Sequence, residues 1–205
     1  MDEIRQKCSA DQIKTARDKL ACFLHASNRD TVFIHPIDHP AIDNTFCPCN
    51  QSFFRALKFY LKAGILKFIF YQPYNSIKVW FLRRCGASIG KNVYFSDGVW
   101  IDPNHTHLLT IEDDVLLGLK AHLFFHEYRL NEYRAGRITI RKGSLVGGLS
   151  VIGPGVEIGE SATVSAMAAV CRDVPSGMIA VGNPAVNIPG AGRKSSIVSE
   201  GLPIC

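Results

Sequence analysis

An aliphatic residue recurs at every sixth position between residues 140 and 174, and this period constrains the fold more than any other feature of the chain. A small or β-branched residue follows each of them four positions later. The aliphatic positions are Ile140, Val146, Ile152, Ile158, Val164 and Val170, and the following positions are Ser144, Ser150, Val156, Ala162, Ala168 and Val174. Neither the helical period of 3.6 nor the strand period of 2 explains this spacing. The spacing instead predicts a solenoid in which each hexad forms one short strand and one turn.

The same period is present upstream, beginning soon after Cys85. The repeat positions fall into four groups of three hexads, at residues 89/95/101, 111/117/123, 140/146/152 and 158/164/170. Three strands per coil form a triangular prism, whose stacked coils make parallel sheets with strands about 4.8 Å apart. The residues expected to stack are alike: Ile89, Ile111, Ile140 and Ile158 on the first face; Phe95, Leu117, Val146 and Val164 on the second; Ile101, Leu123, Ile152 and Val170 on the third. We therefore expect a mainly β protein built on a parallel β-helix of about four coils.

Two insertions interrupt the repeat, and both follow the third face. Ile101 and Ile111 are ten residues apart, and Leu123 and Ile140 are seventeen apart, against six for a regular hexad. Both insertions therefore leave the prism at the same corner on consecutive coils. Insertions gathered on one edge of a repeat scaffold usually build its working surface. Histidines at 105, 107 and 126 lie in these insertions, so we expect the functional site at this corner.

The first 84 residues lack the repeat and are predicted to form a basic, mainly α-helical N-terminal arm. Helices are predicted over about 1–28, 51–71 and 74–84. The prolines between Thr31 and Asn50 instead predict a loop or linker. Residues 51–84 hold seven basic side chains and no acidic one. This segment is expected to pack on the end of the prism or on a neighbouring subunit, with contact to an anionic membrane surface as the alternative.

Cysteine usage and hydropathy exclude several classes of protein. The seven cysteines are scattered, and Cys47-Pro-Cys49 is one residue short of a CxxC pair, which favours free thiols in a reducing compartment. The N-terminus lacks the apolar core of a signal peptide, and four basic residues interrupt the apolar run 53–71. We expect a cytoplasmic protein, at most peripheral to a membrane, that requires no metal and recognises no nucleic acid.

The region 85–190 resembles the left-handed β-helix (hexapeptide-repeat) acyltransferases. The resemblance rests on the repeats and on the segments AHLFFHEYRLNEYRAGRITI, LVGGLSVIGPGVEIG and DVPSGMIAVGNPA. It is strongest to the branch that holds maltose, galactoside and xenobiotic acetyltransferases and polysaccharide O-acetyltransferases. It implies a left-handed prism, a homotrimer, and acetyl-CoA bound as co-substrate in the groove between adjacent prisms. The chain then divides into the arm (1–84), the acyltransferase domain (85–190) and a flexible C-terminal tail (191–205).

The resemblance also implies roles for individual residues. His126 matches the family's general base, and an imidazole has a pKa suited to taking a proton from a hydroxyl. Acceptor-binding candidates lie on the two insertions: Asp102, Asn104, Glu127, Tyr128, Arg129 and Arg134. Asp102 and Asn104 could equally form a turn, and Glu127 could orient the His126 ring or remain a solvated charge. Acetyl-CoA-binding candidates are Gly148, Ala166, Arg172, Asn183 and Pro184, although Val186 and Asn187 stand where relatives commonly carry a basic residue.

The resulting hypothesis is an acyltransferase that moves an acetyl or other short acyl group from acyl-CoA to a hydroxyl of a sugar or polysaccharide precursor. An N-acetyltransferase acting on an amino sugar and a non-catalytic trimeric scaffold remain alternatives. A zinc enzyme of the γ-carbonic anhydrase type is disfavoured. That type needs two histidines five apart, whereas His122 and His126 are four apart and His105 and His107 are two apart.

Overall fold

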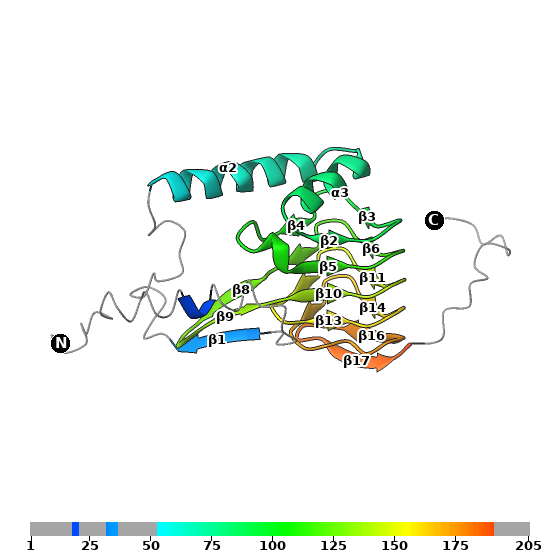
Figure 1. Ribbon diagram of the computed structural model, residues 1–205. Coiled ribbons are helices and arrows are strands. Elements are labelled where there is room, and N and C mark those ends of the chain that lie inside the picture. Colours follow the sequence, from blue (N-terminus) through cyan, green and yellow to red (C-terminus); the bar gives the residue numbers. More distant parts are fainter. Residues whose placement is uncertain (1–17, 21–31, 37–52, 191–205) are drawn as a thin grey trace.

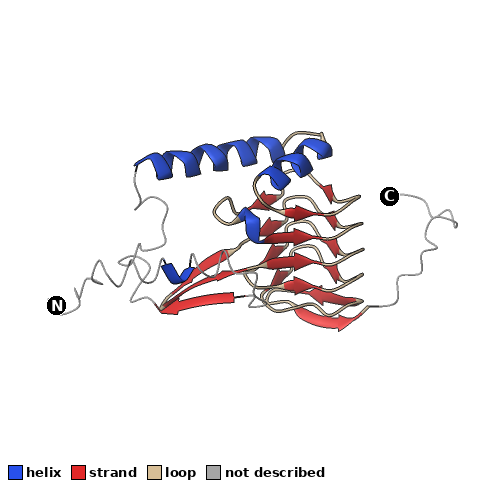
Figure 2. Ribbon diagram, viewed as in Figure 1, coloured by secondary structure: helices blue, strands red, loops and turns tan. Residues whose placement is uncertain are grey.

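Three parallel sheets form the faces of a prism in the computed structural model, which describes residues 18–20, 32–36 and 53–190 (Figures 1 and 2). The first sheet contains β2 (Ser88–Ile89), β5 (Leu109–Ile111), β10 (Ile138–Ile140) and β13 (Glu157–Ile158). The second contains β3 (Tyr94–Phe95), β6 (Leu116–Leu117), β11 (Leu145–Val146), β14 (Thr163–Val164), β16 (Met178–Val181) and β17 (Val186–Pro189). The third contains β4 (Trp100–Ile101), β7 (His122–Leu123), β12 (Val151–Ile152) and β15 (Ala169–Val170). The prediction of a mainly β protein with parallel sheets is confirmed.

The stacking register is the one expected from the hexads. Ile111 pairs with Ile89 on one side and with Ile140 on the other. The second and third sheets follow the same rule, as in the pairs Phe95–Leu117 and Ile101–Leu123. The stacking also continues beyond the last predicted hexad, because β16 pairs in parallel with β14 before β17 turns back antiparallel.

The hexad pattern has a direct cause in the packing of the prism interior. The side chains at the stacked positions point inward and are almost fully buried. Only small groups fit at the positions four residues later. Two of these are serines, and their hydroxyls donate 2.7 Å hydrogen bonds to carbonyl oxygens: Ser144 to Gly159, and Ser150 to Gly147. These bonds offset the free-energy cost of burying a hydroxyl group.

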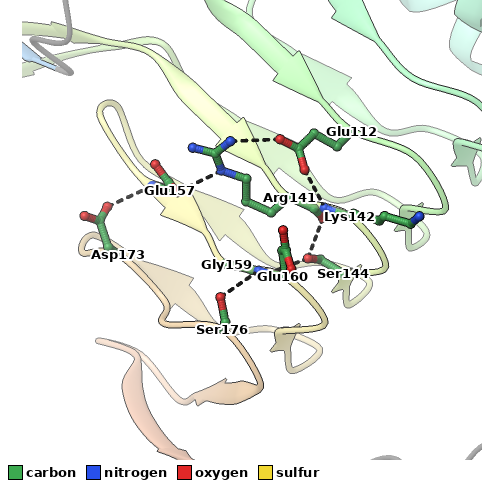
Figure 3. A network of polar contacts seen from close by, with 9 residues as sticks. All are labelled: Glu112, Arg141, Lys142, Ser144, Glu157, Gly159, Glu160, Asp173 and Ser176. Atoms are coloured by element: carbon green, nitrogen blue, oxygen red, sulfur yellow. Dashed lines mark hydrogen bonds and ion pairs between the residues drawn. The ribbon is translucent and has the colours of Figure 1, made fainter.

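Charged side chains reinforce the register on the outside of the first sheet (Figure 3). Arg141 donates to Glu112 at 2.8 Å on the preceding coil and to Glu157 at 2.9 Å on the following coil. Because these side chains are partly exposed, each ion pair contributes at most about 1 kcal/mol. The two ion pairs therefore add little to the overall stability, but they form only when neighbouring coils of the first sheet are stacked in this register.

Two helices close the prism at its first coil. They are α2 (Phe53–Phe70) and α3 (Asn75–Arg84). Phe70 packs its ring against Phe95 with centroids 5.5 Å apart. The side chain of Asn75 accepts from the amide of Phe95 and donates to the carbonyl of Val93, which occupies the free edge of β3. Within the described ranges, no helix combines the length and the apolar character that a membrane-spanning segment needs.

The structure corrects the prediction of a loop or linker over residues 31–50. Residues 32–36 form β1 (Val32–Pro36), which pairs antiparallel with β9 (Glu132–Gly136). β9 in turn pairs with β8 (His126–Arg129), so the longer insertion is a β-hairpin extended by a third strand. The N-terminal arm is therefore not purely helical. Residues 18–20 are helical, but the rest of the predicted helix 1–28 and the tail 191–205 lie outside the described residues.

Candidate active site

The two insertions meet beside the third sheet. β4 ends at Ile101 and β7 ends at Leu123, and the two strands are paired neighbours. The shorter insertion therefore begins, at Asp102, next to the start of the longer one. The shorter insertion contains the 3₁₀ helix η2 (Thr106–Leu108), and the longer one forms the β8–β9 hairpin. This arrangement brings together residues that are more than twenty positions apart in the sequence.

A histidine–aspartate pair is the centre of this corner. Nδ1 of His126 is hydrogen-bonded to Oδ2 of Asp102. A carboxylate can only accept, so Nδ1 carries a proton, and in the neutral form of the ring Nε2 then has a free lone pair. The Asp102 side chain is buried, whereas that of His126 is 26% exposed. The pair thus presents a basic ring nitrogen on an imidazole that a substrate can reach.

Asp102 remains ionised despite its burial. Burial alone would raise the pKa of Asp102, but the hydrogen bond and the charge of His126 outweigh it, and the pKa is lowered. The backbone amide of Asn104 contributes by donating to Oδ1 at 2.9 Å. Asp102 and Asn104 therefore do form a turn, and this turn aims the second carboxylate oxygen at His126.

A second histidine and a tyrosine support the pair from inside. His105 is buried, and its ring centroid lies 5.9 Å from that of His126. Burial and the neighbouring His126 lower the pKa of His105 to about 4, so this imidazole is neutral near pH 7. The hydroxyl of Tyr133 lies 3.5 Å from Nε2 of His105, and burial raises the pKa of that hydroxyl. The rings of His105 and Tyr133 therefore pack as uncharged groups next to the His126 ring.

The charged residues of the hairpin pair with one another. Oε1 of Glu127 accepts from Arg129 at 2.8 Å and from Arg134 at 3.1 Å. The carboxylate that orients the His126 ring is therefore Asp102 and not Glu127. Tyr128 stacks edge-on against both His126 and Tyr133, with centroids 6.3 and 4.9 Å apart.

The candidate acetyl-CoA residues lie elsewhere on the chain. Gly148 and Ala166 occupy the turns that precede β12 and β15, whereas the insertions follow β4 and β7. All four strands run parallel, so these two groups of residues stand at opposite edges of the third sheet. Arg172 is exposed beyond β15, and Asn183 and Pro184 are exposed between β16 and β17. Within one chain, Gly148 and Ala166 therefore stand at the edge opposite His126, whereas Arg172 lies at the same edge as His126, two strands further along the third sheet.

Helix α2 also reaches the corner, through a residue that the sequence did not single out. Nζ of Lys62 donates to Oγ1 of Thr106 at 2.9 Å, and that hydroxyl donates to the carbonyl of Cys85 at 2.9 Å. Burial lowers the pKa of Lys62. In the sequence, Lys62 was one of several basic residues of the predicted helix. Its contact could not be predicted, because its partner Thr106 lies 44 positions further along the chain. Groups of three or more potential metal-ligating side chains are absent from the described part of the chain.

Fold and site together define a β-helix protein with a histidine–aspartate pair at one edge of its third sheet. Comparison with known proteins narrows this class of protein. The chain is 33% identical over 115 residues to "Putative acetyltransferase YvoF" of Bacillus subtilis, covering 56% of this chain and 67% of that protein. It is 34% identical over 113 residues to the galactoside O-acetyltransferase of Escherichia coli, covering 52% of this chain but only 55% of that protein. No protein-family model matches the chain.

A solved structure supports the same fold. The maltose O-acetyltransferase of Clostridium difficile superposes with a TM-score of 0.54 at 18% identity, covering 69% of this chain and 90% of that one. The chain belongs to the hexapeptide-repeat acetyltransferase family, whose fold is the left-handed β-helix. The resemblance drawn from the sequence motifs is thereby confirmed.

Proposed function

We propose that this protein transfers an acetyl group from acetyl-CoA to a hydroxyl group of a saccharide acceptor, with His126 as the general base. The observation that carries the proposal is the contact between His126 and the buried carboxylate of Asp102. Membership of an acetyltransferase family supports the reaction class. The names of the galactoside and maltose O-acetyltransferases support a hydroxyl acceptor on a sugar.

The proposed reaction needs the arrangement of protons that the pair provides. Nε2 of His126 takes the proton of the acceptor hydroxyl as its oxygen attacks the thioester carbonyl. The C–S bond then breaks, and the proton passes from the imidazolium to the leaving thiolate of CoA. The Asp102 carboxylate stabilises the imidazolium between these two steps and holds Nδ1 as a donor throughout. No metal is required for either proton transfer.

Binding of the acceptor is assigned to the two insertions. Asn104 stands on the shorter insertion, and the other four candidates lie on the hairpin that carries His126: Glu127, Tyr128, Arg129 and Arg134. Tyr128 contacts the His126 ring, whereas Glu127 and Arg134 are paired on the neighbouring positions of the hairpin. Tyrosine rings and paired guanidinium groups suit the apolar faces and hydroxyl groups of a sugar.

Binding of acetyl-CoA is assigned to the opposite edge of the third sheet of a neighbouring copy. Gly148 and Ala166 would leave space for the pantetheine arm, and Asn183 and Pro184 would form the terminal turn. Arg172, which follows β15, would face the phosphates. The separation of Gly148 and Ala166 from His126 within one chain supports a homotrimer in which each site uses two copies. This placement also explains why Gly148 and Ala166 follow each other at the same corner of consecutive coils.

Release of free CoA thiol tests the proposal directly. The protein is incubated with acetyl-CoA and matched panels of neutral sugars and amino sugars, so that hydroxyl and amine acceptors are compared. We expect turnover with at least one neutral saccharide, and a fall in kcat of about 10²–10⁴-fold for His126→Ala. His122→Ala is the matched control, because His122 lies on β7 with its ring stacked on Phe124. Full activity of His126→Ala, or turnover restricted to amines, would overturn the proposal.

A further inference from the structure

Helix α2 is apolar on the side that faces away from the prism. Leu66, Ile69 and Phe70 are buried on its inner side. The opposite side exposes six large apolar residues, here called the outer face: Phe53, Phe54, Leu57, Leu61, Ile65 and Phe68. Phe54 is 77% exposed and Phe68 is 68% exposed. At 100° per residue these six positions form one stripe along the helix. Figure 1 shows that the C-terminal part of α2 lies over the first coil and that its N-terminal part extends beyond the prism, on the side of the β8–β9 hairpin.

A stripe of this kind requires a partner. Leucine and phenylalanine side chains gain about 1.5–3 kcal/mol each when they leave water, so contiguous exposed apolar surface marks an interaction site. Near its C-terminus, α2 packs on the core of the prism through Leu66 and Phe70. The outer face points away from these contacts, and its side chains are exposed.

Positive charge borders the outer face on both sides. Lys58 and Lys67 are exposed and flank the stripe at opposite edges of the helix. The tyrosines at 60 and 71 are exposed next to it, at 59% and 56%. Between residues 53 and 84 there are seven basic residues and no acidic one. An apolar stripe edged by lysines and tyrosines is typical of helices that lie at a lipid–water interface.

The charges favour an anionic lipid surface over a second copy of this chain. Two copies packed through the outer face would bring Lys58 and Lys67 of each copy together, with no carboxylate of α2 or α3 to pair with them. Such like-charge contacts oppose association. Anionic headgroups supply the missing negative charge, and the acyl-chain boundary accommodates the aromatic rings. Because the inner side of α2 is buried on the prism, the helix can only lie along such a surface.

We propose that α2 binds the surface of anionic lipid bilayers through its outer face, with Lys58 and Lys67 reaching the headgroups. The inner side of the same helix contacts the shorter insertion through Lys62 and Thr106. Bound in this way, the helix holds Thr106 of the shorter insertion about 10 Å, one helix diameter, from the headgroups. The membrane contact does not depend on the acetyl-transfer reaction, and each can be tested without the other.

Vesicle flotation of the full chain tests the proposal. The vesicles are phosphatidylcholine alone or phosphatidylcholine mixed with phosphatidylserine. We expect the protein to float with the mixed vesicles and to remain largely in solution with the neutral ones, and added salt should weaken the binding by screening. Lys58→Glu with Lys67→Glu should lower the bound fraction at least tenfold, because each lysine near an anionic surface contributes about a fivefold gain.

Two further variants keep the test specific. Lys91→Glu with Lys142→Glu is the matched control, since both lysines are exposed on turns of the prism and neither belongs to α2. Binding should change less than about twofold. Leu61→Ser with Phe68→Ser should abolish flotation without lowering thermal stability, because both side chains are exposed. The proposal is refuted if the control pair loses as much vesicle binding as the α2 pair. It is also refuted if the wild-type protein binds neutral and anionic vesicles equally. Refutation also follows if the outer-face variants change only the oligomer size, since a second copy would then be the partner.

Discussion

Replacement of Asp102 by asparagine isolates the role of its charge from its shape. The amide keeps an oxygen that can accept from the Asn104 backbone, but its NH₂ group can donate to Nδ1 of His126. Donation to Nδ1 favours the tautomer in which Nε2 carries the proton, and that nitrogen can no longer act as a base. The variant should therefore fold normally and lose activity.

The size of the loss follows from the contact that is removed. A hydrogen bond to a charged group contributes about 1.5–3 kcal/mol, and 1.36 kcal/mol corresponds to tenfold in rate, so we expect kcat/KM to fall about ten- to 150-fold. The loss should be smaller than in His126→Ala, because the Asp102→Asn imidazole can still take the productive tautomer part of the time.

Steady-state release of CoA thiol, with acetyl-CoA and acceptor each varied, measures this effect. The matched control is Asp113→Asn, which changes an aspartate that accepts from the Lys91 amide on the far side of the repeat. Its activity should stay within about twofold of wild type. Wild-type kcat/KM in Asp102→Asn, with an intact fold by circular dichroism, would refute the role of the carboxylate.

Three further predictions concern stability. The pKa of His105 falls from 6.5 to about 4 on folding, so its contribution to the free energy of unfolding is complete above pH 6.5 and decreases by about 3 kcal/mol as the pH falls to 4. Urea titrations across this range should show that pH dependence of the free energy of unfolding. The same pH dependence in His105→Asn would disprove the assignment. In Gly147→Ala the new Cβ would stand 2.5 Å from the backbone nitrogen of Ala166, which should lower the free energy of unfolding by about 1–3 kcal/mol. Gly64→Ala, on a helix with nothing within 4 Å of the new Cβ, should stabilise the protein slightly. Equal effects of the two substitutions on urea unfolding would contradict the packing argument. Phe95→Ala should cost about 3–5 kcal/mol by the same measurement, because that ring joins the helices to the first coil, and a cost below about 1 kcal/mol would count against that junction.

The repeat could be predicted from the sequence because each stacked residue has a similar neighbour one coil away. Ile111, for example, must match Ile89 on the preceding coil and Ile140 on the following coil, so the sequence pattern directly reflects the packing. The corner of the insertions followed from the same pattern, since each insertion is visible as an interruption. Periodicity therefore located the site without any knowledge of its chemistry.

The partners within the site could not be predicted in the same way. Asp102 was identified as a turn former or acceptor ligand, and its bond to His126 depends on how two irregular segments fold against each other. His105 was not assigned an individual role, because nothing in its spacing indicates that it packs next to the His126 ring. Tyr133 was expected to line the acceptor site together with Tyr128, whereas the structure buries it beside His105. A signal did exist for β1, where Val32 begins a short β-prone run, but the surrounding prolines outweighed it.

The pairing of β1 with β9 differs in sequence separation from the contacts that build the prism. Within the repeat, a strand pairs with a strand one coil away, as Ile140 pairs with Ile158, so the prism can grow coil by coil from local contacts. Val32 instead pairs with Gly136, and all the residues of α2, α3 and the first two coils lie between them. Closing so long a loop carries a large entropic cost unless the intervening chain is already compact. We therefore expect the prism to assemble first, and β1 to join the hairpin that carries His126 only after the scaffold has brought the two ends together.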